Sequence, residues 1–339
     1  MAQTYIGSSV LRKEDLRFMM GKARYVDDVK LPHMLHSAIL RSPHAHARVL
    51  SIDASAALEM EGVAAVYTYQ DVVQAVAPRP IPMRRGAYSG LERFLQYPLA
   101  GEKVRYVGEP VAVVVAESRY LAEDALDAIE VEYEPLPAIV DVWGSMKGDV
   151  LLFEEHGTNL ALEYEGSLGD ADSVFAEADY TRKEEFRCHR HTGNPLETRG
   201  LVASYDPGTG DLTVWGETKV PHFNRGVLAS LLEIPEHRIH FVEPDVGGGF
   251  GIRGEFYPEN FILPFCSMKL GRPVKWIEDR MEHLIAANHS REHLCQLEIA
   301  ATNDGVILGM RAEIYGALGG YVRTHGASVP ISVGAMLMG

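Results

Sequence analysis

Residues 240–256, HFVEPDVGGGFGIRGEF, join a strand-like run to a loop with five glycines between positions 247 and 254. Glycine has no Cβ, so a backbone built from it can adopt φ > 0 and approach a ligand closely. Consecutive N–H groups in such a loop can point the same way and bind an anion, usually a phosphate. One large side chain, Phe250, lies in the middle. We therefore predict that a phosphorylated cofactor meets the protein here.

A dinucleotide-binding site is the generic interpretation of this loop. Residues 249–254 fit the pattern G-x-G-x-x-G, and the acidic residue Glu278 follows at the end of a predicted strand. That arrangement outlines a nicotinamide or flavin dinucleotide site. However, the loop lies in the middle of the chain and is flanked by predicted β-hairpins, which are not typical of a doubly wound sheet. NAD or FAD binding is therefore the weaker alternative.

The segment from Cys188 to Arg199 holds the other residues that could do chemistry. On a strand, His189 and His191 would share one face and could bind a metal, but no second ligand pair is visible. We expect structural histidines, in the core of the second domain or around the cofactor. We expect Glu197 and Arg199 to fix the segment through hydrogen bonds. No metal ligand is predicted among the side chains.

Composition limits the classes of function. The chain has 339 residues, 46% hydrophobic, with a net charge of −15. This acidity argues against nucleic acid as a partner. No signal peptide is visible, and the longest apolar run, residues 111–116, is too short to span a membrane, so a cytoplasmic protein is expected. Three scattered cysteines argue against a disulfide scaffold, an iron–sulfur cluster or a structural zinc site: Cys188, Cys266 and Cys295.

Two domains of class α+β are expected to position the loop. Residues 1–147 predict a compact α/β domain, in which a continuous apolar strand precedes a helix that Ser118 can cap. Its predicted strands are residues 34–40, 49–52, 63–67, 111–116 and 129–134, and its predicted helices are residues 55–61 and 119–129.

Residues 148–167 read as a linker, and residues 168–339 form the second domain. Pro264 should kink or split one of its helices. The chain stops directly after an apolar run, residues 328–338, as if cut inside a domain or completed by another polypeptide. The predicted elements are strands 201–205, 212–215, 237–246, 274–277, 293–302 and 306–315, helices 223–233 and 255–270, and a helix capped by Asp279.

Several segments together resemble the molybdenum hydroxylases, the large subunits of xanthine dehydrogenase, aldehyde oxidase and carbon monoxide dehydrogenase. The resemblance implies that family's N-terminal hammerhead domain, followed by the first part of its molybdopterin-binding domain. The segments that carry it are DVGGGFG (residues 245–251), GKARYVDD (21–28), LRSPHAH (40–46), VRYVGEPVAV (104–113), residues 123–137 and PLETRG (195–200).

The resemblance implies an oxidoreductase subunit with a molybdenum–pterin cofactor, in bacteria usually the cytosine dinucleotide form. The metal is then held by the pterin rather than by side chains. Such enzymes hydroxylate an aldehyde or an N-heterocycle with oxygen derived from water. Their electrons leave through [2Fe–2S] clusters and FAD, which in bacteria often belong to separate partner subunits.

The resemblance also implies site residues. Four positions match the loop that approaches the pterin and the metal: Gly248, Gly249, Phe250 and Gly251. Lys219 stands where the family has a glutamine near the apical metal ligand, and its ammonium would favour anionic metal states or an anionic substrate. Some members carry a substrate-orienting Glu at the position of Gly254. The adjacent Glu255 is the candidate here, displaced by one residue.

The family's large subunits are much longer than this chain. Their substrate loop with an arginine and their late glutamate, the general base, find no counterpart in the 339 residues. The sequence therefore leaves the catalytic residues unknown. It also leaves two interpretations open: a second polypeptide of the molybdenum subunit supplies the missing parts, or the chain is a truncated, non-catalytic or assembly subunit of such a complex.

Overall fold

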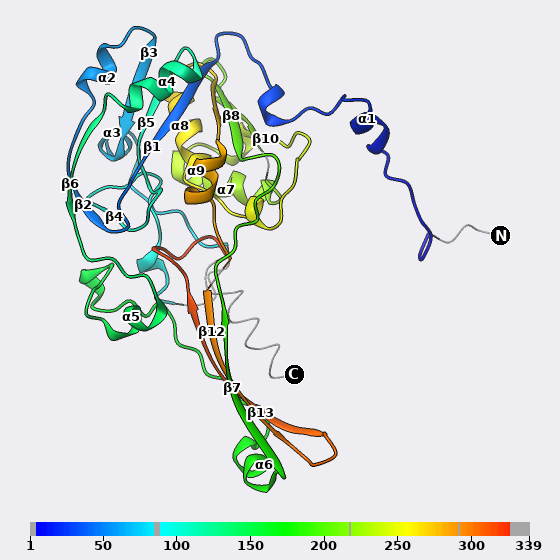
Figure 1. Ribbon diagram of the computed structural model, residues 1–339. Helices are drawn as coiled ribbons and strands as arrows, with labels where there is room; N and C mark the ends of the chain where they lie inside the picture. Colours follow the sequence, from blue (N-terminus) through cyan, green and yellow to red (C-terminus); the bar gives the residue numbers. More distant parts are fainter. Residues whose placement is uncertain (1–4, 85–88, 217, 291, 326–339) are drawn as a thin grey trace.

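The computed structural model describes residues 5–84, 89–216, 218–290 and 292–325. They form a rounded body, an arm of long strands that projects from it, and an N-terminal segment with one short helix, α1 (Asp15–Met19), that runs away from the body (Figure 1). The apolar run of residues 328–338 lies outside the described residues.

A seven-stranded mixed sheet organises the body. Its strand order is β10-β9-β8-β11-β1-β5-β3, and only the pairs β1/β11 and β10/β9 are parallel. The doubly wound sheet of a dinucleotide-binding domain is therefore absent from the described residues. The strands are β1 (Leu35–Arg41), β3 (Val63–Thr68), β5 (Pro110–Ala116), β8 (Gly200–Asp206), β9 (Asp211–Gly216), β10 (Ile239–Val242) and β11 (Val274–Ile277).

The N-terminal part forms the predicted α/β unit. Strand β5 is fully buried, and its consecutive residues Val113 and Val114 belong to two different core clusters, one on each face of the sheet. Ser118 caps the next helix, since its Oγ accepts a hydrogen bond from Leu121 N at 3.2 Å. The remaining elements here are α2 (Ser55–Glu59), α3 (Tyr69–Ala75), α4 (Arg119–Leu126), α5 (Val142–Lys147) and a second sheet of β4 (Lys103–Val104), β2 (Ala47–Asp53) and β6 (Glu130–Pro135).

Three helices of the C-terminal part are α7 (Pro221–Leu232), α8 (Glu259–Leu270) and α9 (Arg280–Ala286). The main core lies between the sheet and helices α3, α7 and α8. The predicted split at Pro264 is wrong, since α8 runs through it as one helix, while a kink there stays a prediction. Every residue from Glu259 to Ser267 is buried, so packing holds the helix although the proline lacks one backbone donor. No helix of the described residues is long and apolar enough to cross a membrane.

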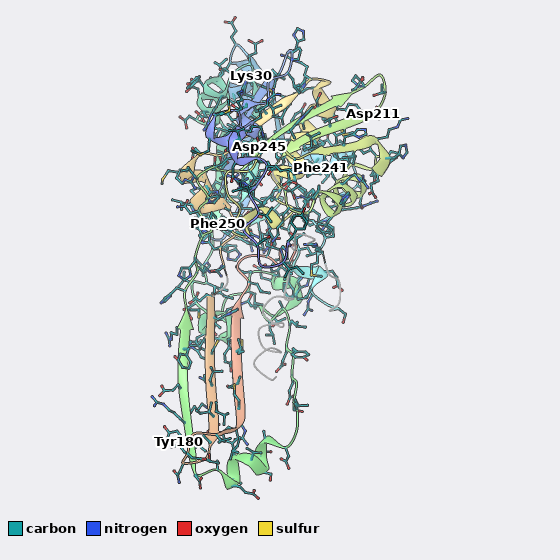
Figure 2. All side chains as sticks on the ribbon, turned by 90° about the vertical axis from the view of Figure 1, so that its right-hand side faces the viewer. Lys30, Tyr180, Asp211, Phe241, Asp245 and Phe250 are labelled. Atoms are coloured by element: carbon teal, nitrogen blue, oxygen red, sulfur yellow. The ribbon has the colours of Figure 1, made fainter. Side chains whose placement is uncertain are left out.

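The projecting arm is a three-stranded antiparallel sheet, β13-β12-β7, with α6 (Ala171–Glu177) at its tip (Figures 1 and 2). The predicted hairpin is confirmed as β12 (Glu292–Ala301) and β13 (Ile307–Ala317), with Gly305 at φ +90° in its turn. Strand β7 (Tyr180–Cys188) was not predicted. All nine of its residues are exposed, so it lacks the alternation of apolar and polar residues that marks a half-buried strand.

The two predicted domains share the main sheet, because β1 pairs with β11 across more than 200 positions of sequence. Part of the predicted linker, residues 148–167, packs against the rest of the protein. The ring of Phe153 is buried and packs edge-on against Phe94 at 5.2 Å and Tyr321 at 5.7 Å. The boundaries at residues 147 and 168 stay a prediction.

Candidate functional site

The glycine loop leaves the edge strand of the main sheet and leads into α8. Strand β10 ends at Val242, earlier than the predicted Val246, because it pairs with β9 only from Ile239 to Val242. Pro244 follows and offers no backbone donor. A short 3₁₀ helix, Ile252–Gly254, then separates the loop from α8. Figure 2 labels two residues of this stretch, Asp245 and Phe250.

Two glycines of the loop are required by close packing. A methyl group on Gly247 would lie 2.4 Å from Glu197 Cβ, and one on Gly248 would lie 3.0 Å from Pro195 Cβ. Two others face open space, since nothing lies within 4 Å of a methyl group on Gly249 or Gly251. The loop is thus pressed against segment 195–197 on one side and open on the other.

The backbone from Gly248 to Gly251 adopts unusual conformations. Gly248 and Gly251 have φ of +112° and +91°, which a side chain would disfavour. Phe250 also has a positive φ, +47°, and its side chain is 77% exposed. A bulky residue held in this region and exposed to water is a local outlier of the kind that clusters at ligand sites.

The backbone N–H groups of the loop also fall into two sets, one bonded to the packed side and one open. Gly247 N–H donates to Glu197 Oε2 at 2.5 Å. In contrast, the N–H groups of the next four residues find no acceptor among the described residues. Four consecutive open donors can bind anionic oxygens. They belong to the four predicted cofactor residues, Gly248, Gly249, Phe250 and Gly251.

Glu197 and Arg253 fix the conformation of the loop through hydrogen bonds to its backbone. Arg253 donates through Nε to Gly248 O at 2.6 Å and through Nη2 to Glu197 O at 2.9 Å. Burial lowers the pKa of Arg253 to about 10, and burial also raises the pKa of Glu197. The prediction that Glu197 fixes its segment is confirmed.

Asp245 ties the entrance of the loop to the N-terminal segment. Its carboxylate accepts two hydrogen bonds from the Arg17 guanidinium and one from Arg24 N at 2.8 Å. The hydrogen bond from Arg17 lowers the pKa of Asp245. Sequence analysis did not find this contact, because more than 200 residues separate the partners.

Lys219 lies at the other end of the loop. Its backbone N–H donates to Arg253 O at 3.1 Å, and its exposed side chain runs along Gly254. Lys219 and Gly254 are therefore in contact. The preceding residue, Thr218, is buried, and its Oγ accepts hydrogen bonds from Val220 N and Asn224 Nδ2.

Glu255 is buried next to Gly254. Its carboxylate accepts hydrogen bonds from Thr324 Oγ1 and from His325 Nδ1, the second at 2.5 Å. Burial alone would raise the pKa of Glu255, but the hydrogen bond from His325 and the charge of Arg323 outweigh it and lower the pKa. The structure thus places this carboxylate in a contact with segment 324–325. Its role toward a substrate stays a prediction.

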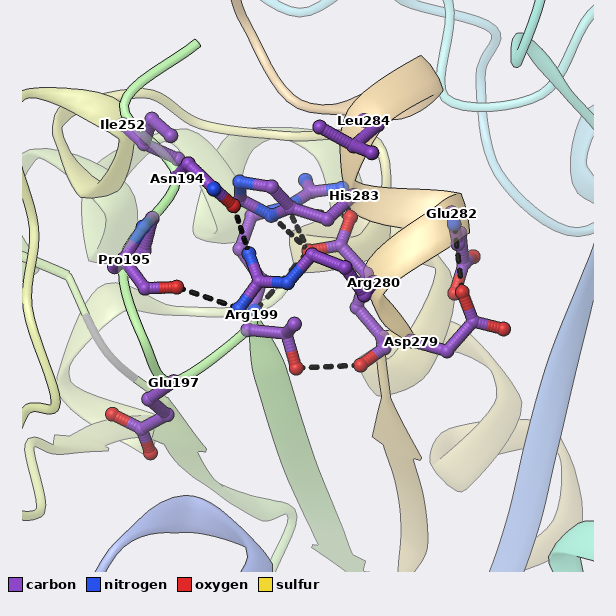
Figure 3. Close-up of polar contacts among 12 residues, drawn as sticks. Asn194, Pro195, Glu197, Arg199, Ile252, Asp279, Arg280, Glu282, His283 and Leu284 are labelled. Atoms are coloured by element: carbon purple, nitrogen blue, oxygen red, sulfur yellow. Dashed lines mark hydrogen bonds and ion pairs between the residues drawn. The ribbon is translucent and has the colours of Figure 1, made fainter.

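A buried ion network begins at Arg199, and Figure 3 labels two of its members, Arg199 and His283. Arg199 donates to Glu278, through Nε at 3.1 Å, and pairs with Glu259 at 3.2 Å. Glu278 also contacts His283 Nδ1 at 2.7 Å. Arg41 on β1 joins Glu259 at 2.5 Å, which links both parts of the chain. The prediction that Arg199 has a structural role is confirmed.

The network overturns the dinucleotide interpretation. Burial would raise the pKa of Glu278, but the Arg199 guanidinium lowers it to about 2, so the group is a buried carboxylate. Its side chain is fully buried and already bonded, so it cannot reach a ribose. In the sequence, this network is indicated only by charged residues that lie within apolar segments, such as Arg41 and Glu259.

The histidine pair lies elsewhere. His189 and His191 follow the edge strand β7 and are exposed, so the alternative that places them in the core of the second domain is wrong, while a place around the cofactor stays a prediction. The reason is that β7 belongs to the projecting arm. Within the described residues, no group of three or more His, Cys, Asp or Glu side chains could hold a metal ion.

Comparison with known proteins assigns families to both parts of the chain. Residues 152–339 match the molybdopterin cofactor-binding domain, and residues 20–137 match the a/b hammerhead domain of aldehyde oxidase and xanthine dehydrogenase. The large chain of carbon monoxide dehydrogenase from Afipia carboxidovorans is 42% identical over 91% of this chain. The large molybdopterin subunit of nicotinate dehydrogenase from Eubacterium barkeri is 30% identical over 96% of it.

A solved structure has the same fold. Quinoline 2-oxidoreductase from Pseudomonas putida 86 matches 91% of this chain with a TM-score of 0.85 and 38% identity. The chain spans 39% of that protein and 39% of the carbon monoxide dehydrogenase chain, but 73% of the nicotinate dehydrogenase subunit.

Proposed function

Since the chain belongs to the molybdopterin-dependent dehydrogenases and hydroxylases of the xanthine dehydrogenase and aldehyde oxidase family, we propose that its glycine loop holds a molybdenum–pterin cofactor. The observation that carries this proposal is the row of four consecutive backbone N–H groups, Gly248 to Gly251, without an acceptor among the described residues. Glycine at 249 and 251 keeps the space before them open.

The residues of the loop fit an anionic, oxygen-rich group. The open N–H groups would donate to its oxygens, and Lys219 at the end of the loop would add a positive charge. Phe250, already exposed, would cover the group and exclude water. Glu197 and Arg253 would keep the loop in this shape through their hydrogen bonds to Gly247 and Gly248.

When bound, the cofactor supplies the redox chemistry that transfers oxygen from water to a carbon atom. The residues of this chain bind and orient the cofactor. We propose that a general base and the remaining substrate contacts come from residues outside these 339, on the same or on a second polypeptide. We also propose that [2Fe–2S] and FAD subunits accept the electrons, and that the cofactor is the cytosine dinucleotide form.

We propose a nitrogen heteroaromatic compound as the substrate, with an aldehyde as the alternative. The names of two relatives support the first choice, since nicotinate and quinoline are both nitrogen heteroaromatics. Hydroxylation of such rings occurs at electron-poor carbon atoms.

Isotope labelling tests the reaction. The complete protein, purified with its natural partners, would be incubated in ¹⁸O-labelled water with a panel of N-heterocycles and aldehydes and an artificial electron acceptor. We expect one class to yield a hydroxylated product that carries ¹⁸O. Product labelled from ¹⁸O₂ instead would contradict the proposal, and turnover of neither class by a cofactor-loaded complex would favour the non-catalytic interpretation.

A further inference from the structure

The N-terminal segment, residues 5–29, contacts the entrance of the glycine loop at Asp245. The backbone of Arg24 forms two hydrogen bonds there, since its N–H donates to Asp245 Oδ2 at 2.8 Å and its carbonyl accepts from Asp245 N at 2.9 Å. The Arg17 guanidinium donates to both oxygens of the carboxylate, to Oδ1 at 2.6 Å. Four hydrogen bonds therefore join Asp245 to two residues that lie more than 200 positions away in the sequence.

One end of this segment is fixed to the body of the protein. Val26 is buried, and a methyl group on Gly200 of β8 would lie 3.2 Å from its Cγ1. Lys275 of β11 donates through Nζ to Asp27 O at 2.5 Å. In contrast, residues 5–16 are all exposed. The contacts with the loop entrance therefore form where the chain passes from its exposed part to its packed part.

The position of Asp245 matters for the open donors of the loop. Two residues separate it from Gly248, the first of the four N–H groups without an acceptor among the described residues. Glycine loses more conformational freedom than any other residue when it becomes ordered, so a ligand that had to order this loop would bind more weakly. The contacts of Asp245 fix one end of the loop in advance, and Glu197 fixes its packed side.

The ion pair between Arg17 and Asp245 has a specific geometry. The planar guanidinium bonds both carboxylate oxygens, an arrangement that lysine cannot reproduce. The Asp245 side chain is 14% exposed, and the hydrogen bond from Arg17 lowers its pKa, so the carboxylate stays charged at neutral pH. The Arg17 side chain is 41% exposed, which leaves the pair open to screening by salt.

We propose that Arg17 is a positioning residue, which acts through Asp245 to keep the glycine loop in the form that binds the cofactor and thereby slows cofactor release. This deepens the proposed function and rests on it for the identity of the ligand. A loop that is ordered in advance loses less conformational freedom on binding, so affinity rises without a new contact to the ligand. Loss of the ion pair should appear mainly as faster release, because affinity differences between related complexes lie mostly in the dissociation rate.

Hydrogen–deuterium exchange of the loop, measured by mass spectrometry, tests the positioning role without relying on activity. The complete protein with its partners would be prepared in a host that cannot make the cofactor, as wild type and as Arg17→Gln. Exchange at the bonded amides of Asp245 and Gly247 should be about two- to fivefold faster in the variant, the effect of a partly exposed ion pair. Arg12→Gln is the matched control, because Arg12 pairs with Asp15 within the exposed part of the segment.

Three further comparisons show whether Arg17 acts through Asp245. Arg17→Lys keeps the charge but not the two parallel hydrogen bonds, so its exchange rate should lie between those of wild type and Arg17→Gln. In an Asp245→Asn background, Arg17→Gln should add nothing, because its partner has lost the charge. About 1 M salt, where the screening length is about 3 Å, should speed exchange in wild type more than in Arg17→Gln. Additive effects of the two substitutions would overturn the proposal.

Cofactor release, followed by pterin fluorescence after dilution, connects the ion pair to the ligand. We expect release from Arg17→Gln to be about two- to fivefold faster than from wild type at an unchanged unfolding midpoint, and release from Arg12→Gln to match wild type. Unchanged release from a molybdenum-loaded Arg17→Gln complex would overturn the positioning role and leave the proposed function standing. A fully assembled wild-type complex without molybdenum would instead reject the proposed function, and with it the role of Arg17 toward the cofactor.

Discussion

The glycine loop and the buried ion network both contact residues 195–199, but the polar groups of the two regions differ. Glu197 faces the loop, where four backbone donors stay open. Arg199 faces the network, where Glu278 and Glu259 are both bonded. A buried charge needs its partner, whereas an open donor at the surface is available to a ligand. The difference separates what keeps the protein folded from what it can bind.

Breaking the network should have the largest effect on stability. Arg199→Met would leave Glu278 and Glu259 without their shared cation, and removing one partner of a buried pair costs about 3–5 kcal/mol. The free energy of unfolding of the complete protein, from denaturant titration, measures this. Arg182→Met is the matched control, because Arg182 pairs with Glu184 on the exposed strand β7 and its loss should leave the midpoint unchanged. An equal loss of unfolding free energy in Arg199→Met and Arg182→Met would show that the buried network contributes no more to stability than an exposed ion pair.

A second buried carboxyl, Glu109, shows what happens to the pKa of a buried carboxyl that has no ion pair. It accepts hydrogen bonds from Tyr321 Oη at 2.6 Å and Arg105 N at 2.6 Å, but it forms no ion pair among the described residues. Burial raises its pKa to about 7, whereas Glu278, beside Arg199, has a pKa of about 2. Burial therefore raises the pKa of Glu109, on which the Arg105 charge acts without an ion pair, whereas the direct ion pair with Arg199 outweighs burial at Glu278.

The raised pKa of Glu109 predicts a specific pH dependence. The folded protein binds this proton more tightly than the unfolded chain, so the contribution to stability is present below about pH 4.5 and is lost as the pH rises through 7. Wild type should lose on the order of 2–3 kcal/mol across this window relative to Glu109→Gln. Unfolding of wild type and of Glu109→Gln, measured in parallel between pH 5 and 8, checks this prediction. A difference in free energy of unfolding that does not change with pH would show that Glu109 is ionised throughout.

Substitution at two glycines of the loop, Gly247 and Gly249, probes its packed and its open side. Gly247→Ala would force a methyl group to 2.4 Å from Glu197 Cβ, and such overpacking costs about 1–3 kcal/mol. Gly249→Ala meets nothing within 4 Å and should leave stability unchanged, although the methyl group would enter the space proposed for the cofactor. Both variants should lose molybdenum. Only the first should lower the melting temperature, and a similar fall in the second would mean that the open side is structural.

The smallest effect on stability is expected at Phe250. The ring is 77% exposed, so Phe250→Ala should change the free energy of unfolding by less than about 0.5 kcal/mol. The rate at which the cofactor is released should nevertheless increase, because the ring is proposed to cover it. Release can be followed by pterin fluorescence after dilution. A destabilised variant with unchanged release would assign Phe250 to folding.

The sequence predicted those parts of the fold that rest on local signals. The buried strand β5, the cap at Ser118 and the hairpin β12–β13 follow from apolar runs, a capping residue and turn residues. Strand β7 carries no such signal because both of its faces are exposed. The proline in α8 does not split the helix, one of the two predicted outcomes, because burial on all sides overrides the loss of one hydrogen bond.

The candidate site was predictable only in part, for the same reason. Glycine spacing identified the loop, and its open donors agree with that expectation. The contacts of Asp245 with Arg17 and of Lys219 with Gly254 join distant segments, and no local pattern encodes them. The network of Arg199 was visible only as isolated charges in apolar surroundings.

The central claim is that the open donors of the glycine loop bind a molybdenum–pterin cofactor. The most direct measurement is the molybdenum content, by mass spectrometry, of the complete protein purified from its native host with its partners attached, beside the Gly249→Ala variant. We expect stoichiometric molybdenum with co-purifying iron and flavin in wild type, and a clear loss of molybdenum in the variant at unchanged stability. A fully assembled wild-type complex without molybdenum would contradict the account.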